Sequence, residues 1–91
     1  MPCDNGRKYI GDNQTYLHPI TNAQKCQEQC QIDRDCIYWT WDLYNWELNK
    51  HGVCSKKSSK SWEGNNAYSI SGNGDCMISD TPPKGMGTML Y

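Results

Sequence analysis

The sequence predicts an α+β domain in which one helix packs on a curved antiparallel sheet of about four or five strands. Three observations support this fold class. Six cysteines occur in 91 residues. One segment carries the signals that begin and end a helix, and several short aromatic or β-branched segments are separated by turns. We therefore expect one small domain that is held together by three disulfides.

The cysteines and the composition together favour a disulfide framework. Hydrophobic residues make up 36% of the chain, with four Trp, six Tyr and no Phe. A domain this small buries a modest core and generally needs covalent cross-links. An even number of cysteines in a short chain is typical of an oxidising compartment, so we expect a secreted or extracellular protein that unfolds when it is reduced. The cysteines are Cys3, Cys26, Cys30, Cys36, Cys54 and Cys76.

A zinc module is the alternative interpretation of these cysteines. Structural zinc sites usually contain closely spaced cysteine pairs such as CxxC, and this sequence has none. The best available ligand set would strand the other three cysteines; it is Cys26, Cys30, His51 and Cys54. We therefore expect neither a metal nor any other cofactor.

The first predicted element is a short strand over residues 7–11, which ends at Gly11. Residues 12–19 are polar and rich in turn formers, so they are predicted to form a loop. Asn13 and Thr15 belong to an Asn-Gln-Thr acceptor sequence for N-glycosylation. An unmodified surface loop is an equally good interpretation of that motif.

A helix is predicted next. Thr21 as the N-cap and Gln24 three residues later form a capping-box pattern. The helix should run to about Ile32, because a turn sequence follows. Cys26 and Cys30 lie one helical turn apart and so share a face, from which they can join two neighbouring segments.

The second half of the chain predicts further strands. Residues 36–41 alternate in a pattern that places Ile37, Trp39 and Trp41 on one face of a strand. Residues 42–52 are predicted to be a long polar connection.

Two more strands are expected after that connection. The first is residues 52–55, followed by a basic, serine-rich segment over residues 56–61. The second is residues 67–71, which a glycine-rich turn over residues 72–74 ends.

The pattern places one module over residues 1–78 and a linker or disordered tail over residues 79–91. The tail prediction rests on its Thr-Pro-Pro-Lys-Gly sequence and on its lack of periodicity. No apolar leader follows Met1, so we expect a secretion signal to lie upstream in a longer chain. No apolar run is long enough for direct membrane insertion.

In their order along the chain, these features resemble the PAN/apple modules, and in particular the apple modules of apicomplexan microneme adhesins. The resemblance runs from Cys3 to Cys76. Its elements are a first cysteine shortly before a Tyr-Ile-Gly strand, a capped helix with Cys26-x3-Cys30, Cys36 opening an aromatic strand, Cys54-Ser55-Lys56-Lys57, and Ser71-Gly72-x3-Cys76. The resemblance implies one helix on a curved antiparallel sheet.

The resemblance also implies one cysteine pairing among the many that six cysteines allow. The implied pairs are Cys3–Cys76, Cys26–Cys54 and Cys30–Cys36. Two features depart from the family pattern. Lys56 stands where the family usually has Leu, which weakens an expected core contact, and residues 42–52 form an unusually long connection.

Nothing in the sequence indicates catalysis. A hydrolase needs a nucleophile with a base and an orienting partner, and the two histidines, His18 and His51, lie in predicted loops. The acidic residues of the turns form no evident acid–base pair; they are Asp33, Asp35, Asp42 and Glu47. The net charge of −1 gives the chain no general electrostatic attraction to nucleic acid. We therefore do not expect nucleic acid as a partner.

The sequence and the resemblance together predict a non-enzymatic, extracellular binding module of a multi-domain adhesive protein. Its partner would be an extracellular protein or a host-cell receptor, bound during cell attachment or complex assembly. The alternative is a lectin-like module for carbohydrate or sulfated glycan. In that case Trp46 or Trp62 would stack on a sugar beside neighbouring asparagines.

The candidate binding residues are aromatic and basic side chains of the predicted loops and strand ends: Tyr44, Trp46, Lys56, Lys57, Lys60 and Trp62. Each has a structural alternative, because tryptophans often pack in cores and lysines often protect strand edges. An exposed tryptophan would favour recognition, since exposed aromatic residues are typical anchors of interfaces. If Trp46 and Trp62 were both buried, the module would instead be a spacer that only presents its neighbouring domains.

Overall fold

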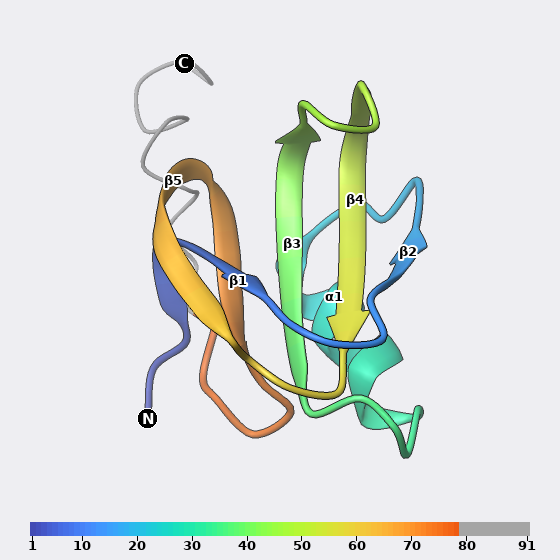
Figure 1. Ribbon diagram of the computed structural model, residues 1–91, viewed down its shortest axis with the longest axis vertical. Coiled ribbons are helices and arrows are strands. Elements are labelled where there is room, and N and C mark those ends of the chain that lie inside the picture. Colours follow the sequence, from blue (N-terminus) through green and yellow to red (C-terminus); the bar gives the residue numbers. More distant parts are fainter. Residues whose placement is uncertain (79–91) are drawn as a thin grey trace.

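The computed structural model describes residues 1–78 as one helix packed on a five-stranded sheet (Figure 1). The elements are β1 (Asp4–Ile10), β2 (Thr15–Leu17), α1 (Ala23–Gln31), β3 (Tyr38–Asn45), β4 (Lys50–Lys57) and β5 (Trp62–Asn73). The predicted α+β class is confirmed, with one helix, one antiparallel sheet and three disulfides. The predicted linker or tail over residues 79–91 lies outside the described residues.

All neighbouring strands of the sheet are antiparallel, in the order β1-β5-β3-β4-β2. The 12-residue strand β5 pairs with β1 on one side and with β3 on the other. The register of β1 shifts between Asn5 and Arg7, where Gly6 has a φ of 84°. Glycine adopts such a left-handed conformation readily, and a bulge of this kind bends a strand.

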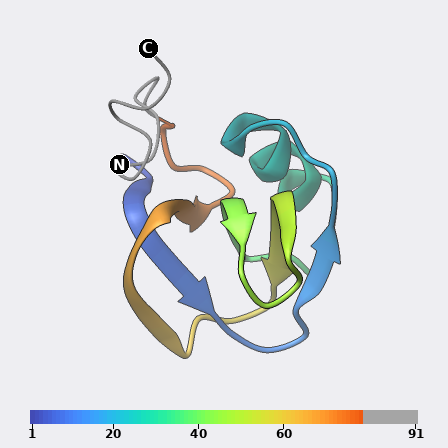
Figure 2. The ribbon, with the colours of Figure 1, turned by 90° about the horizontal axis from the view of Figure 1, so that it is seen from above.

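Because the sheet curls, its central strands have two covered faces. Figure 2 shows α1 on one side of β3 and β4, while β1 and β5 curve around the opposite side. The face towards α1 carries the main apolar cluster, which we call the helix-side core. It consists of Ala23, Cys26, Cys30, Trp39, Trp41, Cys54 and Ile70.

Trp39 and Trp41 fill the helix-side core, as their predicted common face requires, with 0% and 6% of their surface exposed. Their indole N–H groups donate to backbone carbonyls, Trp39 to Asn73 at 2.6 Å and Trp41 to Ile20 at 2.8 Å. Both rings are therefore buried without an unpaired polar atom. Ile37 precedes β3 and is 49% exposed, so it is not part of the buried core that Trp39 and Trp41 form.

Three disulfides cross-link the domain, and they join the pairs that the PAN/apple resemblance implies. Cys30–Cys36 ties the end of α1 to the approach to β3, Cys26–Cys54 joins α1 to β4, and Cys3–Cys76 closes the two ends of the domain. Their Cα–Cα distances, in the same order, are 5.2, 5.3 and 4.9 Å. The three cysteines of the alternative zinc set, Cys26, Cys30 and Cys54, are all part of disulfides.

Helix α1 begins differently from its predicted capping box. Its N-cap is Asn22, whose Oδ1 accepts a hydrogen bond from the backbone N–H of Lys25 at 2.9 Å. Thr21 as N-cap is therefore wrong, and Gln24 donates to Glu28 at 3.4 Å instead of reaching back. Asn is as effective at this position as Ser or Asp, and Asn22 has the extended backbone that an N-cap needs.

Residues 12–19 contain the edge strand β2 rather than only the predicted loop. Thr15 lies opposite Lys56 and Leu17 opposite Cys54, so β2 exists through its pairing with β4. Three residues are too few to show a hydrophobic period, and for this reason the local sequence does not reveal the strand.

The long connection predicted over residues 42–52 is mostly a β-hairpin. β3 continues to Asn45 and β4 begins at Lys50, with Tyr44 opposite His51. Asp42 of this hairpin belongs to a polar interior, whereas Glu47, Asn49 and Lys50 are polar because they are exposed. Leu43 continues the alternation of Trp39 and Trp41 and packs against the helix-side core, so the strand period extends beyond the predicted end at residue 41.

The second covered face of the central strands is this polar interior, made of Thr40, Asp42, Ser55, Lys57, Ser69 and Ser71, each at most 2% exposed. The Lys57 ammonium group donates to Thr40 Oγ1 at 3.1 Å and to the Ser55 carbonyl and hydroxyl at 3.1 and 2.9 Å. Burial lowers the pKa of Lys57 to about 7, although the nearby Asp42 carboxylate opposes that shift.

Asp42 is the negative group of the polar interior. Its carboxylate accepts hydrogen bonds from Lys8 at 3.3 Å, from Asn45 at 2.8 Å and from the Ser69 hydroxyl. Buried charges need such partners, because an unpaired one costs several kcal/mol. The polar interior is therefore a hydrogen-bonded core in its own right.

Candidate functional site

The most exposed cluster of aromatic side chains lies at the end of the β3–β4 hairpin. We call it the aromatic surface and define it as Tyr44, Trp46, His51 and Tyr68. The ring of Tyr44 lies 4.4 Å from Trp46 and 4.7 Å from His51, between centroids. The ring centroids of Tyr68 and Trp46 lie 6.1 Å apart. All three contacts are edge-to-face, a favourable geometry for aromatic pairs.

The strand pairing explains how these residues meet. Tyr44 on β3 lies directly opposite His51 on β4, and Tyr68 comes from β5, the neighbour of β3 on its other side. Trp46 follows the last residue of β3 and occupies the hairpin turn (Figure 1). The aromatic surface thus takes side chains from three neighbouring strands and the turn.

The turn that presents Trp46 is fixed by hydrogen bonds. Asn45 is 2% exposed, its amide donates to Asp42 at 2.8 Å, and its Oδ1 accepts the Leu48 N–H at 2.8 Å. Asn49 completes the turn with a φ of 56° and accepts a hydrogen bond from the Tyr44 hydroxyl. Asn tolerates left-handed backbone better than other side-chain-bearing residues, which suits this position.

Trp46 is 67% exposed although its neighbours hold it in place. A fixed, exposed Trp loses little conformational entropy when it is buried by a partner, and such residues dominate the binding energy of many interfaces. Leu48, on the same turn, is 36% exposed and adds apolar area beside it. The arrangement is suited to contact with another molecule.

Trp62 is also exposed, at 52%, but it lies apart from the aromatic surface. It begins β5 six residues before Tyr68, which corresponds to roughly 20 Å along an extended strand. Its ring lies over Gly64, where an added Cβ would be 2.3 Å from ring atom Cη2. Trp62 therefore rests on its own strand.

The three candidate lysines do not form one basic patch. Lys57 is buried in the polar interior, so its prediction as a surface contact is wrong. Lys56 forms an ion pair with Asp33 at 2.8 Å, and Lys60 forms one with Glu63 at 3.1 Å. These carboxylates balance the positive charge that a sulfated glycan would require.

Lys60 instead contributes to a pocket of about 310 Å³ beside the Cys3–Cys76 disulfide, which we call the terminal pocket. Its other functional side chains are Asp4, Tyr9 and Tyr38. The Lys60 ammonium lies 4.4 Å from the centre of the Tyr9 ring and 5.5 Å from that of Tyr38, within the range of cation–π contacts.

Tyr9 is the polar anchor of the terminal pocket. Its hydroxyl donates a hydrogen bond to the Asp4 carboxylate. Burial and this neighbouring carboxylate raise the pKa of Tyr9 well above its usual value. The phenol is therefore neutral at physiological pH, and the pocket presents a carboxylate, an ammonium group and two aromatic rings.

Sequence reasoning found Tyr44 and Trp46 but missed His51 and Tyr68 as members of the aromatic surface. Their membership depends on the register of three strands, and the sequence around His51 predicts a loop. The same limitation applies to the terminal pocket, whose residues come from both ends of the domain. A local pattern around any one of them does not indicate the others.

Within residues 1–78, no group of three or more His, Cys, Asp or Glu side chains is placed to hold a metal ion. The helix of this region lacks the length and the apolar character needed to cross a bilayer. The three disulfides are consistent with a secreted or extracellular protein. Comparison of the chain with family models, with curated proteins and with solved structures gave no match.

Proposed function

We propose that this chain is a non-enzymatic, extracellular binding module that contacts a protein partner through its aromatic surface. The observation that carries the proposal is Trp46, which is 67% exposed at the tip of a hydrogen-bonded hairpin. Removal of such an anchor from an interface typically costs about 2–4 kcal/mol of binding free energy. The sequence resemblance to PAN/apple modules agrees with this role.

Adhesion or complex assembly is the setting that we propose for this contact. The aromatic surface occupies one hairpin end of a small domain, so a single module offers a limited contact area. Interfaces of limited area are often weak, and repeated modules in one protein raise the overall affinity through avidity. A multi-domain adhesive protein that meets an extracellular protein or host-cell receptor would use the module in this way.

Carbohydrate binding is the second candidate, and the terminal pocket is the observation that favours it. Its volume of about 310 Å³ lies at the lower end of the range for small-ligand sites. Asp4 and Lys60 offer an acceptor and a donor to sugar hydroxyls, and Tyr38 offers an aromatic side. The ion pairs of Lys56 and Lys60 favour a neutral sugar over a sulfated glycan.

The test measures binding of the oxidised chain, made tetravalent on streptavidin, to the surface of cultured epithelial cells by flow cytometry. Trp46→Ala should lower binding at least tenfold, while Trp62→Ala, a matched exposed tryptophan, should leave it nearly unchanged. Treatment of the cells with trypsin should abolish binding by the unaltered chain. Far-UV circular dichroism and intact mass under non-reducing conditions confirm that each variant is folded and oxidised.

The same assay separates the two candidates. If a monosaccharide series or mild periodate treatment of the cells removes binding, and Lys60→Gln does so while Trp46→Ala does not, the terminal pocket is the binding site. Equal binding by Trp46→Ala and the unaltered chain would contradict the protein-docking proposal.

A further inference from the structure

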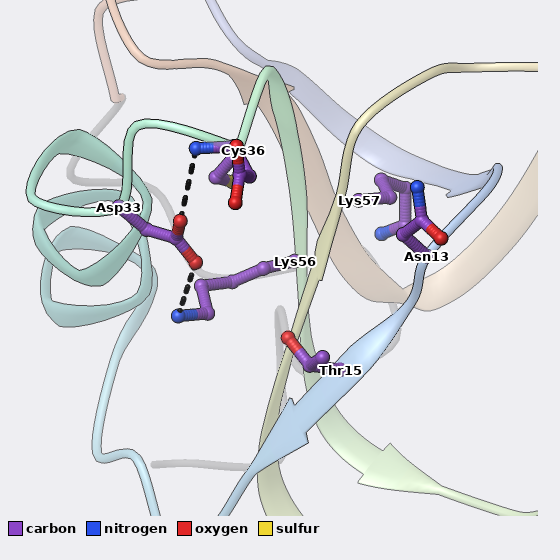
Figure 3. A pocket seen from close by; sticks show the side chains of 7 residues that line it. Asn13, Thr15, Asp33, Cys36, Lys56 and Lys57 are labelled. Atoms are coloured by element: carbon purple, nitrogen blue, oxygen red, sulfur yellow. Dashed lines mark hydrogen bonds and ion pairs between the residues drawn. The ribbon is translucent and has the colours of Figure 1, made fainter.

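The Asn-Gln-Thr motif of residues 13–15 lies on the rim of a second, smaller pocket. This pocket has a volume of about 160 Å³, and it lies between the start of β2, the end of β4 and the turn after α1. Figure 3 shows Asn13 and Thr15 on one side, with Asp33 on the opposite side of Lys56. Asn13 and Thr15 are both exposed, so the acceptor motif is on the surface.

We propose that Asn13 carries an N-linked glycan. It belongs to the only Asn-x-Ser/Thr motif in the sequence, and the residue between Asn and Thr is Gln rather than Pro. The second, independent support is the set of three disulfides, because the oxidising secretory compartment that forms them is also where N-glycans are attached.

The folded domain can accommodate the modification without repacking. Asn13 sits in the turn between β1 and β2 with a φ of 56°, and its side-chain amide donates to the Ser58 hydroxyl at 3.0 Å. A glycosylated amide keeps one N–H, so this hydrogen bond can persist. The open pocket beside Asn13 leaves space for the first sugar, flanked by the ion pair of Asp33 and Lys56.

The attachment reaction needs a sugar donor, which is an oligosaccharide linked to a polyisoprenyl diphosphate. The bond from Asn13 Nδ2 to C1 of the first N-acetylglucosamine forms while the bond from C1 to the diphosphate oxygen breaks. One amide proton passes to a base of the transferase, and the lipid diphosphate leaves with the electron pair. No oxidation or reduction is involved.

A glycan at Asn13 lies at the end of the sheet opposite the aromatic surface. Asn13 contacts Ser58, just beyond the end of β4, whereas Trp46 and His51 lie near its start. The eight residues of β4 separate these ends by roughly 25 Å of extended strand. The glycan would therefore cover the exposed edge at β2 and leave the hairpin accessible.

The test is secretion of the full 91-residue chain, behind a cleavable signal sequence, from a cultured animal cell line. Intact mass should show an excess that peptide N-glycosidase removes, and peptide mapping should find the former acceptor converted to aspartate at position 13. Thr15→Ala should abolish the excess, while Thr15→Ser should retain it. A separately secreted glycoprotein from the same cells serves as the positive control.

Secretion of the folded, oxidised chain at its unmodified mass, with the control protein glycosylated, would overturn the proposal. So would a glycan that survives Thr15→Ala. The mass measurement requires no binding partner, so its outcome is independent of the proposed docking function. In the cell-binding assay, enzymatic removal of the glycan should change binding by less than twofold; a larger gain or loss would contradict its location away from the contact.

Discussion

The two buried faces of the central strands β3 and β4 are stabilised by different interactions. Trp39 and Trp41, with two of the disulfides, fill the helix-side core, whereas hydrogen bonds around Lys57 and Asp42 fill the polar interior. The first depends on covalent bonds and on apolar burial, and the second on the protonation of buried groups. The stability of the whole domain should therefore depend on two separate variables, on the redox state through the helix-side core and on the pH through the polar interior.

Reduction is expected to have the largest effect, because it removes all three cross-links. Loop-closure entropy assigns roughly 2, 3.5 and 4.5 kcal/mol to loops with sequence separations of 6, 28 and 73. These values are non-additive upper estimates, yet together they rival the whole stability of a typical small domain. We expect a phosphine reductant to abolish the near-UV circular dichroism of the tryptophans at pH 7 and 25 °C, and a retained spectrum would contradict this.

A change of pH should affect mainly the polar interior. The pKa of Lys57 is about 7 in the folded chain, against the ordinary value of 10.5 for a free lysine side chain. Between these values the unfolded chain binds one more proton, so the free energy of unfolding should rise with pH by up to about 1.4 kcal/mol per unit. Below about pH 7 Lys57 is protonated in both the folded and the unfolded chain. Its contribution to the free energy of unfolding is then constant and at its lowest.

Urea denaturation at pH 7, 8 and 9 measures this slope. The window avoids the titration of Tyr9, whose raised pKa would oppose the trend at higher pH. Lys57→Met, which keeps the length of the side chain, should flatten the dependence, while Lys50→Met on the exposed hairpin should not. An equal slope in the unaltered chain and in Lys57→Met would show that another group is responsible.

The smallest expected effect is on the helix side and tests how α1 begins. Asn22→Ala removes the acceptor for the Lys25 N–H and should lower the free energy of unfolding by about 1 kcal/mol. Thr21→Ala should have little effect, since Thr21 is outside the helix and exposed. Urea denaturation of the two variants distinguishes them; a larger loss from Thr21→Ala would restore the capping-box interpretation.

The two faces also differ in how far the sequence predicts them. The helix-side core follows from local patterns, because the spacing of Cys26 and Cys30 and the alternation of Trp39 and Trp41 are visible in the chain itself. The polar interior could not be predicted, since Lys57 and Asp42 look like surface residues until the curl of β1 and β5 covers them. Burial of such groups is decided by long-range pairing.

The candidate site shows the same division. The residue type and polar surroundings of Trp46 indicate a binding residue, and its exposure supports that interpretation. The basic segment around Lys57 indicates a binding residue there as well, yet Lys57 is buried. His51 and Tyr68 join the aromatic surface only through the register of β3, β4 and β5, which no local pattern fixes. Exposure and register are therefore the two quantities that sequence reasoning lacked.

The Cys3–Cys76 bond has a mechanical consequence. It joins the first and last parts of the folded region, where Pro2 also bridges Met77. Tension applied to the chain on either side of these residues would pass through the covalent bond and bypass the strands between them. The folded strands would therefore carry none of this force. The β3–β4 hairpin would keep its shape under load as long as the Cys3–Cys76 bond stays oxidised.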